Sequence, residues 1–352
     1  MVNNKDIYFA PVVIPTLCRS THFIRLIESL KKNGWAKYTD IYVGLDYPPA
    51  EKYKKGWQEI CDYLDGDDFS KYFSKFTVFK RNENWGSFKN TKDLIHYVWE
   101  RYECWIRTDD DAEFSPNFLE YEDKCLWEYR NDPDVIFVSG YSYPIEWRHE
   151  DGATCFKQNF SVSSWGLGFW RSKKEGYAKY IESGQMLKDA GVVVKNRYYE
   201  RMIDSCFRDY FSAALSFGSQ VPLLKMCSDI SLRAYIACQG KYCISPIISK
   251  VRNHGFDGTG EYCVAVEKKG NHALDYDYAS QIIDEQPEFN YIPDNSLKFN
   301  DENRKMLSDF DYRSENDMAL ARHNFHLIEK YGLCVAKIIH AFEVLSGKNK
   351  KV

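Results

Sequence analysis

The first 110 residues alternate between short apolar runs and amphipathic stretches, which limits the folds open to this chain. The runs that read as strands span residues 7–14, 40–45, 76–79 and 102–108. The stretches between them carry apolar residues three and four positions apart, a spacing typical of helices packed on one side. The third of these helices is expected to begin at residue 90 or 91. Strands that alternate with helices form parallel sheets with right-handed crossovers. The sequence therefore predicts an α/β fold.

Three consecutive aspartates, Asp109, Asp110 and Asp111, follow the fourth predicted strand. Open α/β sheets bind ligands at the edge formed by the carboxyl ends of their strands. Crowded carboxylates repel one another unless a hard cation or hydrogen-bond donors neutralise them. The triplet therefore indicates a Mg²⁺ or Mn²⁺ ion carried on a nucleotide diphosphate. The alternative is an exposed acidic turn at the start of a helix, where aspartate is favoured anyway.

The composition is that of an ordinary globular protein and excludes few functions. The chain has 352 residues, of which 44% are hydrophobic and 28% charged, and its net charge is -4. This charge gives no support to nucleic-acid binding through a globally basic surface. No apolar run reaches the roughly 18 residues of a membrane span. The eleven cysteines lack Cys-x-x-Cys and zinc-finger spacings, which favours free thiols in a reducing cytoplasm.

The pattern becomes less regular after the triplet. A further strand is predicted over residues 135–139, and residues 141–170 are irregular and aromatic. Helices are predicted over 195–217, 230–237 and 316–345, and the region 284–315 is polar and loop-rich. We therefore expect a main α/β domain over residues 1–270, divided near residue 140. A loop-rich segment and a helical C-terminal extension would follow over 271–352.

Six short motifs, in their order along the chain, resemble those of GT-A glycosyltransferases, especially family 2-like enzymes of bacterial surface-polysaccharide synthesis. They are Val13-Ile14-Pro15-Thr16, the strand end at Asp46, Asn84-Trp85-Gly86, the aspartate triplet, Ser163-Ser164-Trp165-Gly166, and the glycine-rich run 253–260. The resemblance covers residues 7–265 and implies a mostly parallel sheet flanked by helices. It also implies transfer of a sugar from a nucleotide-diphosphate donor, a UDP-sugar by default. The acceptor would be a saccharide or a lipid-linked saccharide.

The resemblance places the donor site in the first half of the main domain. It implies that Pro15, Thr16 and Arg19 hold the base and ribose of the nucleotide, and that Asp46 contacts the base. Asn84 and Gly86 would lie near the nucleotide. For Thr16 and Asn84 the alternative roles are capping a helix and forming a turn.

Within the triplet, the resemblance pairs Asp109 with Asp111 as metal ligands and favours Asp111. It places Asp109 and Asp110 beside the nucleotide-sugar. Mn²⁺ and Mg²⁺ prefer oxygen ligands, and the ion stabilises the diphosphate as the sugar departs. Relatives place a metal-binding histidine after the glycine-rich loop, where this chain has Glu261. His254, earlier in that loop, is the alternative ligand.

The second half, residues 141–270, would hold the acceptor. The resemblance assigns acceptor binding to Trp165 and Gly166, within a mobile loop over residues 165–170, and the alternative is a core-packing turn. An inverting transfer needs a carboxylate that takes the proton from the acceptor hydroxyl. Asp229 matches that position at the start of a predicted helix, where it could also act as a cap. Asp204 is the reserve candidate.

Two other functions remain open on the sequence alone. A nucleotidyltransferase shares the α/β layout and the acidic metal site, but residues 15–19 are not its glycine-rich basic loop. A nucleotide-sugar or glycan-binding protein on a catalytically decayed transferase fold is the second alternative. The amphipathic stretch 336–345 and its basic tail suit contact with the inner face of the cell membrane, or else packing on the main domain.

Overall fold

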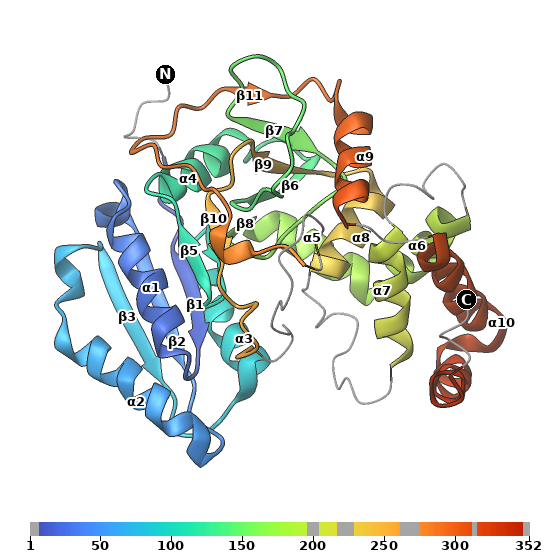
Figure 1. Cartoon of the computed structure of the whole chain (residues 1–352), viewed down its shortest axis with the longest axis horizontal. Helices are drawn as coiled ribbons and strands as arrows, with labels where there is room; N and C mark the ends of the chain where they lie inside the picture. The colour runs from blue at the N-terminus through green and yellow to red at the C-terminus, as the bar shows by residue number, and fades with distance from the viewer. Residues whose placement is uncertain are drawn as a thin grey trace.

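A nine-stranded mixed sheet forms the centre of the molecule, and helices cover both of its faces (Figure 1). In this computed structural model the described residues are 7–195, 204–216, 229–260, 273, 275–311 and 315–347. The strand order within them is β11-β7-β9-β6-β8-β4-β1-β2-β3. The predicted α/β class, a mostly parallel sheet with flanking helices and a helical C-terminal extension, is confirmed.

The first half contains the predicted parallel strands and their crossover helices. The strands are β1 (Val12–Thr16), β2 (Asp40–Leu45), β3 (Lys75–Lys80) and β4 (Cys104–Arg107). The helices are α1 (Ser20–Lys31), α2 (Glu51–Gly66) and α3 (Gly86–Trp99). The first strand begins later than the predicted residue 7. One reason is that the N–H of Ala10 donates to the carboxylate of Asp123, at 2.9 Å, and not to a neighbouring strand.

The second half extends the same sheet beyond β4. Its strands are β6 (Val135–Ser139), β7 (Cys155–Gln158), β8 (Leu167–Trp170), β9 (Tyr242–Pro246) and β11 (Pro293–Asp294). Strand β8 lies between β4 and β6 and is antiparallel to both. A separate two-stranded sheet pairs β5 (Ala112–Phe114) with β10 (Val251–Asn253). Strands β7 and β8 correct the expectation that residues 141–170 are irregular.

Helices make up most of the remaining described chain. They are α4 (Phe118–Glu128), α5 (Arg171–Glu182), α6 (Gln185–Lys195), α7 (Asp204–Leu215), α8 (Asp229–Gln239), α9 (Asn300–Asp311) and α10 (Glu315–Leu345). Short 3-10 helices span Ala36–Tyr38, Phe69–Lys71 and Tyr278–Ser280. None of the described helices is long and apolar enough to cross a membrane. The predicted helix 195–217 falls partly on residues outside the described chain, and α9 lies in the region expected to be loop-rich.

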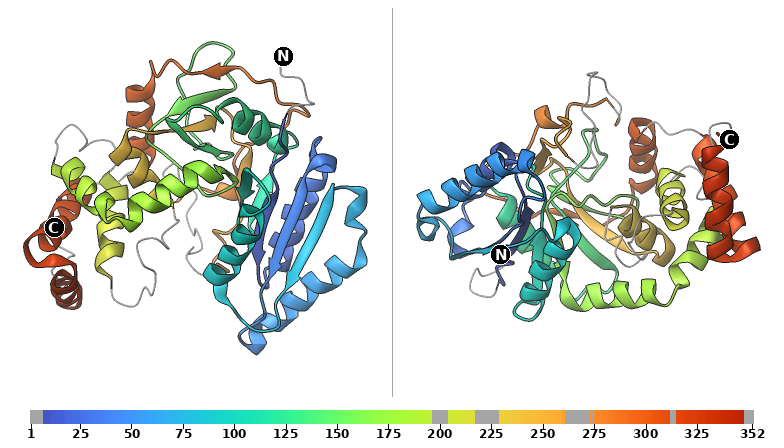
Figure 2. Two further views of the ribbon diagram at one scale, coloured as in Figure 1. Left: turned by 180° about the vertical axis from the view of Figure 1, so that it is seen from behind. Right: turned by 90° about the horizontal axis from the view of Figure 1, so that it is seen from below.

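Two apolar cores lie on opposite faces of the sheet, because successive side chains of a strand point to opposite sides. In β1, Val12 and Ile14 join the core that α1, α2 and α4 cover. Val13, between them, joins the core covered by α3 and by the helices α5 to α8. The views from behind and from below show the helices on the two sides of the sheet (Figure 2). The sheet is thus buried on both faces, and its strand ends remain available for a site.

Helix α10 consists of two helices that meet at Gly332. This glycine has φ 72° and ψ 159°, which breaks the helix. The chain folds back there, since Nε2 of His323 lies 2.9 Å from Oε2 of Glu343. In a straight helix these two residues would be about 30 Å apart. The predicted helix over 316–345 is therefore a helical hairpin.

Candidate active site

The side chains of Thr16, Arg19 and Asp110 connect the carboxyl ends of β1 and β4. Oδ2 of Asp110 accepts a hydrogen bond from Oγ1 of Thr16 at 2.8 Å, and its other oxygen pairs with the Arg19 guanidinium. Asp110 is buried. Three of the residues predicted to bind the donor are therefore brought together, and they bond to one another. Pro15 lies beside them as the penultimate residue of β1.

Asp111 lies next to this group and is also buried. Its Oδ2 is 2.9 Å from Nη1 of Arg19, and its Oδ1 accepts a hydrogen bond from Nδ2 of Asn253 at 3.1 Å. Burial and the negative charge of Asp109 raise the pKa of Asp111 to about 6. Gly255 makes this packing possible, because a Cβ there would lie 2.2 Å from Oδ2 of Asp111. The glycine-rich run therefore touches the triplet.

Asp109 and the predicted base Asp229 lie in the same electrostatic environment. Nη2 of Arg107 donates to Oδ1 of Asp109 at 2.7 Å. Burial raises the pKa of Asp229, the positive charges of Arg107 and Arg233 lower it, and the negative charge of Asp109 raises it. The first residue of α8 thus lies close to the end of β4, although the sequence separates them widely.

The N–H of Ser164 holds the carboxylate of Asp229 in place. It donates to Oδ1 of Asp229 at 2.8 Å. Ser164 belongs to the predicted acceptor motif, so this hydrogen bond brings that motif and the predicted base together. Residues 227 and 228, which precede Asp229 in the motif, lie outside the described chain.

The charges of the triplet fit a divalent cation. Arg19 and Arg107 pair with the triplet, but two positive charges offset only part of its negative charge. Burial raises the pKa of Asp111, and the charges of Asp109 and Asp110 raise it further. Within the described residues, no three His, Cys, Asp or Glu side chains form a metal cage. Mg²⁺ is commonly held by one or two carboxylates together with substrate phosphates. Asp109 and Asp111 are the side chains that would hold such an ion.

His254 pairs with an acid outside the triplet. Its Nε2 lies 2.6 Å from Oε2 of Glu113, and its N–H donates to the carbonyl oxygen of Asp111 at 2.8 Å. Only the backbone of His254 therefore bonds to the triplet. Glu261, at the position where relatives have their histidine, lies outside the described chain.

Asp46 caps helix α3 from the end of β2. Its carboxylate accepts four hydrogen bonds, from the N–H groups of Tyr47, Trp85 and Gly86 at 2.8–2.9 Å and from Nδ2 of Asn84 at 3.2 Å. A carboxylate has about four acceptor positions. A nucleobase would therefore have to compete with four donors of the protein. The cap also explains why α3 begins at Gly86, before the expected start at residue 90 or 91.

An aromatic cluster surrounds Trp165, which is predicted to bind the acceptor. The Trp165 ring meets Tyr141, Tyr278 and Phe256 edge-to-face, with centroids 4.6, 5.5 and 5.8 Å away. The Tyr141 hydroxyl is buried and has no hydrogen-bond partner in the described part of the chain. Burial raises the pKa of Tyr141 well above its usual value, and nearby groups, including Asp229, raise it further. Aromatic rings of this kind can stack on sugar rings.

Gly166 turns the chain into β8. It has φ 65°, and a Cβ there would lie 2.8 Å from the ring of Phe118. The expectation of a mobile loop over residues 165–170 is wrong, because Leu167–Trp170 is a central strand. All four residues of β8 are buried.

Sequence reasoning missed Arg107, Tyr141 and Tyr278. A signal existed for Arg107, which is the last residue of a strand and lies two positions before Asp109. Tyr141 also lies at a strand end, because it follows shortly after β6 ends at Ser139. No local signal marked Tyr278, which reaches the cluster only through the fold.

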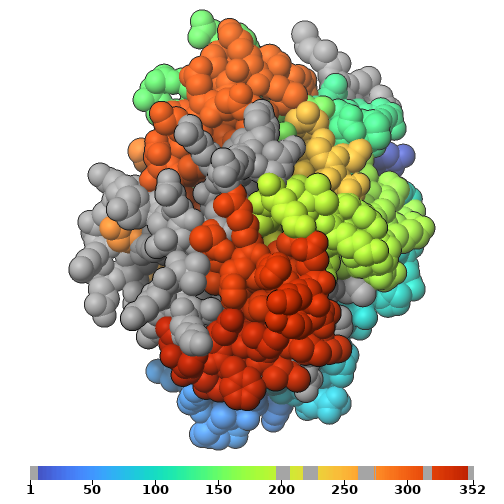
Figure 3. Space-filling view, turned by 90° about the vertical axis from the view of Figure 1, so that its right-hand side faces the viewer, coloured from blue at the N-terminus to red at the C-terminus, as the bar shows by residue number. Residues whose placement is uncertain are grey.

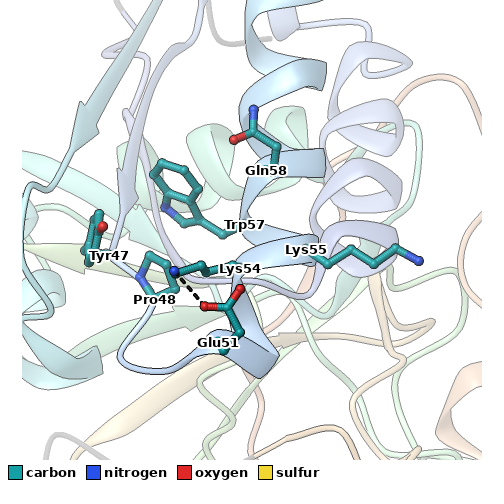
Figure 4. A pocket seen from close by; sticks show the side chains of 7 residues that line it. All are labelled: Tyr47, Pro48, Glu51, Lys54, Lys55, Trp57 and Gln58. Carbon is teal, nitrogen blue, oxygen red and sulfur yellow. Dashed lines mark ion pairs between the residues drawn. The ribbon is translucent and has the colours of Figure 1, made fainter.

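A surface hollow of about 370 Å³ lies at the start of α2 (Figure 4). Its lining residues belong to the β2–α2 connection and to α2, and they are Tyr47, Pro48, Glu51, Lys54, Lys55, Trp57 and Gln58. The hollow adjoins Asp46 through Tyr47 but contains none of the acids of the triplet. The predicted metal ligands and the predicted base therefore do not line this hollow.

Structural comparison finds glycosyltransferases. Residues 1–349 of TarS from S. aureus give a TM-score of 0.37 at 10% identity, over 68% of this chain and 58% of that chain. The mannosyltransferase PcManGT from Pyrobaculum calidifontis, in complex with GDP-Man and Mn²⁺, gives 0.38 at 13% identity, over 97% and 82%. The galactosyltransferase LgtC, in complex with donor and acceptor sugar analogues, gives 0.27 at 12% identity, over 46% and 58%.

The sequence adds no further relationship, since neither a protein-family model nor a curated protein matches it. The matched region spans 58% of the TarS chain, which is less than two thirds of its length. At these TM-scores the likeness is too general to assign an activity. The function has to follow from the residues of the site.

Proposed function

We propose that this chain is a GT-A-type glycosyltransferase. It moves a sugar from a nucleotide-diphosphate donor, a UDP-sugar by default, to a saccharide or lipid-linked saccharide. The transfer takes place on the cytoplasmic side of the cell membrane and is a step of surface-glycan synthesis. The observation that carries the proposal is the place of Asp229, whose carboxylate is held by the N–H of Ser164 and is reached by the charges of Arg107 and Asp109 at the end of β4. This arrangement supplies acids for a metal-bound diphosphate and a separate carboxylate for the acceptor.

Asp229 is the base in this proposal. Burial raises its pKa, which suits a carboxylate that must accept a proton. The acceptor oxygen bonds to the anomeric carbon as the bond from that carbon to the diphosphate breaks, and the hydroxyl proton passes to Asp229. A single displacement of this kind inverts the anomeric centre. Ser164 keeps the carboxylate in place throughout.

The donor binds at strand ends that lie across the triplet from Asp229. The donor lies along the ends of β1 and β4, where Pro15, Thr16 and Arg19 are found, and Asn84 and Gly86 border it. A Mg²⁺ or Mn²⁺ ion held by Asp109 and Asp111 would stabilise the charge of the leaving diphosphate. Trp165 and its aromatic neighbours offer a stacking surface to the acceptor sugar.

Calorimetric titration tests the donor site. The protein is titrated with UDP, GDP, CMP and TDP, each with and without Mn²⁺, and we expect Mn²⁺-dependent binding of one nucleotide. Asp111→Asn should abolish that binding, because it removes a charged oxygen ligand. Asp62→Asn, which changes an exposed aspartate of α2, is the matched control and should bind as the wild type does. Absence of binding to all four nucleotides would overturn the proposal.

Asp229→Asn tests the base. The amide keeps the shape of the side chain but cannot accept the proton, so donor binding should persist while transfer falls by about 10²–10⁴-fold. The readout is transfer to a panel of saccharide acceptors, with Asp62→Asn again as control. Full activity in Asp229→Asn would remove this residue as base. Nucleotide binding without transfer or donor hydrolysis in the wild type would favour a glycan-binding protein instead.

A further inference from the structure

The last helix of α10 is apolar on two sides. Leu333, Ala336 and Ile339 face the protein core. The opposite side carries Val335, Ile338, Phe342 and Leu345, which are 47, 51, 68 and 84% exposed and lie three or four positions apart. We call these four side chains the α10 stripe. An apolar helix face is normally buried, so the stripe is a face that lacks a partner within the described chain.

The stripe lies on an outer surface of the molecule. Figure 3 looks onto the end of the molecule where α10 is exposed. Helix α10 packs on α7, which in turn packs on α8, the helix that begins with Asp229. The strands β1 to β3 and their helices lie at the other end (Figure 1). The stripe is therefore on the same side of the molecule as the acceptor half of the site.

The charge around the stripe is opposite in sign to that of the whole chain. Residues 333–352 contain four lysines and one glutamate, whereas the chain as a whole has a net charge of -4. The single glutamate, Glu343, is already paired with His323. Three of the lysines, Lys348, Lys350 and Lys351, follow the helix directly, in the part of the chain that lies outside the described residues. The end of α10 is thus basic as well as apolar.

We propose that the α10 stripe docks on an anionic lipid bilayer. An apolar helix face inserts into the boundary between head groups and acyl chains, and flanking lysines add attraction to anionic lipids. A second copy of this chain is the competing occupant. The stripe offers four side chains, whereas a stable interface uses about 20–30 residues a side, and a dimer would bring two basic segments together. Apolar exposure and positive charge together therefore favour the bilayer.

Membrane docking through the stripe does not depend on the proposed activity. If the acceptor is lipid-linked, docking would bring the acceptor half of the site toward the surface that holds it. Binding to vesicles is measured without donor or acceptor. A failure of the docking proposal can thus be distinguished from a failure of the glycosyltransferase proposal.

Co-sedimentation of the full chain with vesicles tests the docking. The vesicles contain phosphatidylcholine alone or mixed with phosphatidylglycerol, and we expect the wild type to sediment with the mixed vesicles. Ile338→Ser combined with Phe342→Ser should weaken this binding at least about tenfold, because both side chains lose their apolar contact. Ile282→Ser is the matched control, since Ile282 is 81% exposed and lies outside α10. Lys350→Ala should weaken binding about fivefold.

Three outcomes would overturn the proposal. They are no sedimentation of the wild type, equal sedimentation of the double variant, and a dimer in light scattering that dissociates on Phe342→Ser. Because the stripe is exposed, the thermal unfolding midpoint of the double variant should equal that of the wild type. An equal midpoint shows that any lost binding reflects the stripe and not the folding of the chain.

Discussion

Carboxylates in this protein have contrasting environments, and Glu122 has the least favourable one. Asp46 accepts four hydrogen bonds, whereas both carboxyl oxygens of Glu122 are buried without a partner in the described chain. Burial raises the pKa of Glu122 well above its usual value, and the neighbouring Asp123 raises it further. An ionised Glu122 would be a buried, unpaired charge, so the native state keeps this carboxyl neutral.

Glu122→Gln should flatten the dependence of stability on pH. Above about pH 4.3 the unfolded chain releases the Glu122 proton while the native state retains it. Stability therefore falls as pH rises, by up to about 1.4 kcal/mol per pH unit, until the native pKa is reached. Glutamine carries no proton to release, so this fall should disappear. Urea unfolding at several pH values between 5 and 8 measures the difference in slope.

Glu128→Gln is the control for this experiment. Glu128 lies on the same helix, α4, and is exposed. Its replacement should leave the pH slope as in the wild type. Identical slopes for the wild type and Glu122→Gln would show that Glu122 ionises freely in the native protein.

At the scale of elements, close backbone contacts fix the position of α2 beside the site. Gly56 faces the loop that follows β1, and a Cβ there would lie 1.9 Å from the carbonyl oxygen of Cys18. Backbone atoms of this kind cannot rotate away as a long side chain can. Gly66, at the end of the same helix, has no neighbouring atom within 4 Å of its ideal Cβ position.

Gly56→Ala should therefore destabilise the protein, whereas Gly66→Ala should not. We expect Gly56→Ala to cost at least about 1–3 kcal/mol in the free energy of unfolding, because the helix or the loop must move. Gly66→Ala should be neutral or stabilising by up to about 1 kcal/mol, since alanine favours helix. Chemical denaturation of both variants measures this. Equal effects would mean that α2 moves away from the β1–α1 loop at little cost.

The elements that sequence reasoning found are those with a local signal. Strands β2 and β6 have the predicted bounds, because their apolar runs are bordered by polar turns. Strands β7 and β8 were missed, since four mostly buried residues show no alternation of apolar and polar positions. The start of α3 was misplaced because its cap, Asp46, comes from another strand. A cap of that kind has no signature near the helix that it caps.

At the scale of the whole molecule, the site joins two halves of one sheet. The acids of the triplet come from the end of β4, and Tyr141 and Trp165 come from the regions next to β6 and β8. Motifs in the sequence led to the prediction of Asp229, the triplet and Trp165 as site residues, and these roles stay predictions. No motif pointed to Tyr141, because the burial of its hydroxyl and its contact with Trp165 arise only in the fold.

Tyr141→Phe should change the binding of the acceptor without changing the binding of the nucleotide. It keeps the ring that packs on Trp165 and removes a buried hydroxyl without a partner in the described chain. We expect unchanged nucleotide binding, a KM for the acceptor raised about tenfold, and a stability equal to or about 1 kcal/mol above that of the wild type. Steady-state kinetics and thermal unfolding measure these effects. An unchanged acceptor KM would show that the hydroxyl does not contact the acceptor.

Tyr38→Phe provides the control, because Tyr38 is 45% exposed and belongs to the short helix Ala36–Tyr38 beyond α1. Removal of the Tyr38 hydroxyl should alter neither the KM for the acceptor nor the thermal stability of the protein. A raised acceptor KM in both variants would point to a general effect of the substitution and not to the acceptor half.

The antiparallel position of β8 has a consequence for synthesis on the ribosome. The four parallel strands of the first half leave the tunnel first, but β4 then has an unpaired outer edge, because its neighbour β8 is translated much later. An open strand edge invites pairing with other chains. The nascent protein therefore passes through a stage in which the four strands of the first half are present but the edge of β4 is open to pairing with other chains. Translational pausing before residue 167 would prolong that exposure.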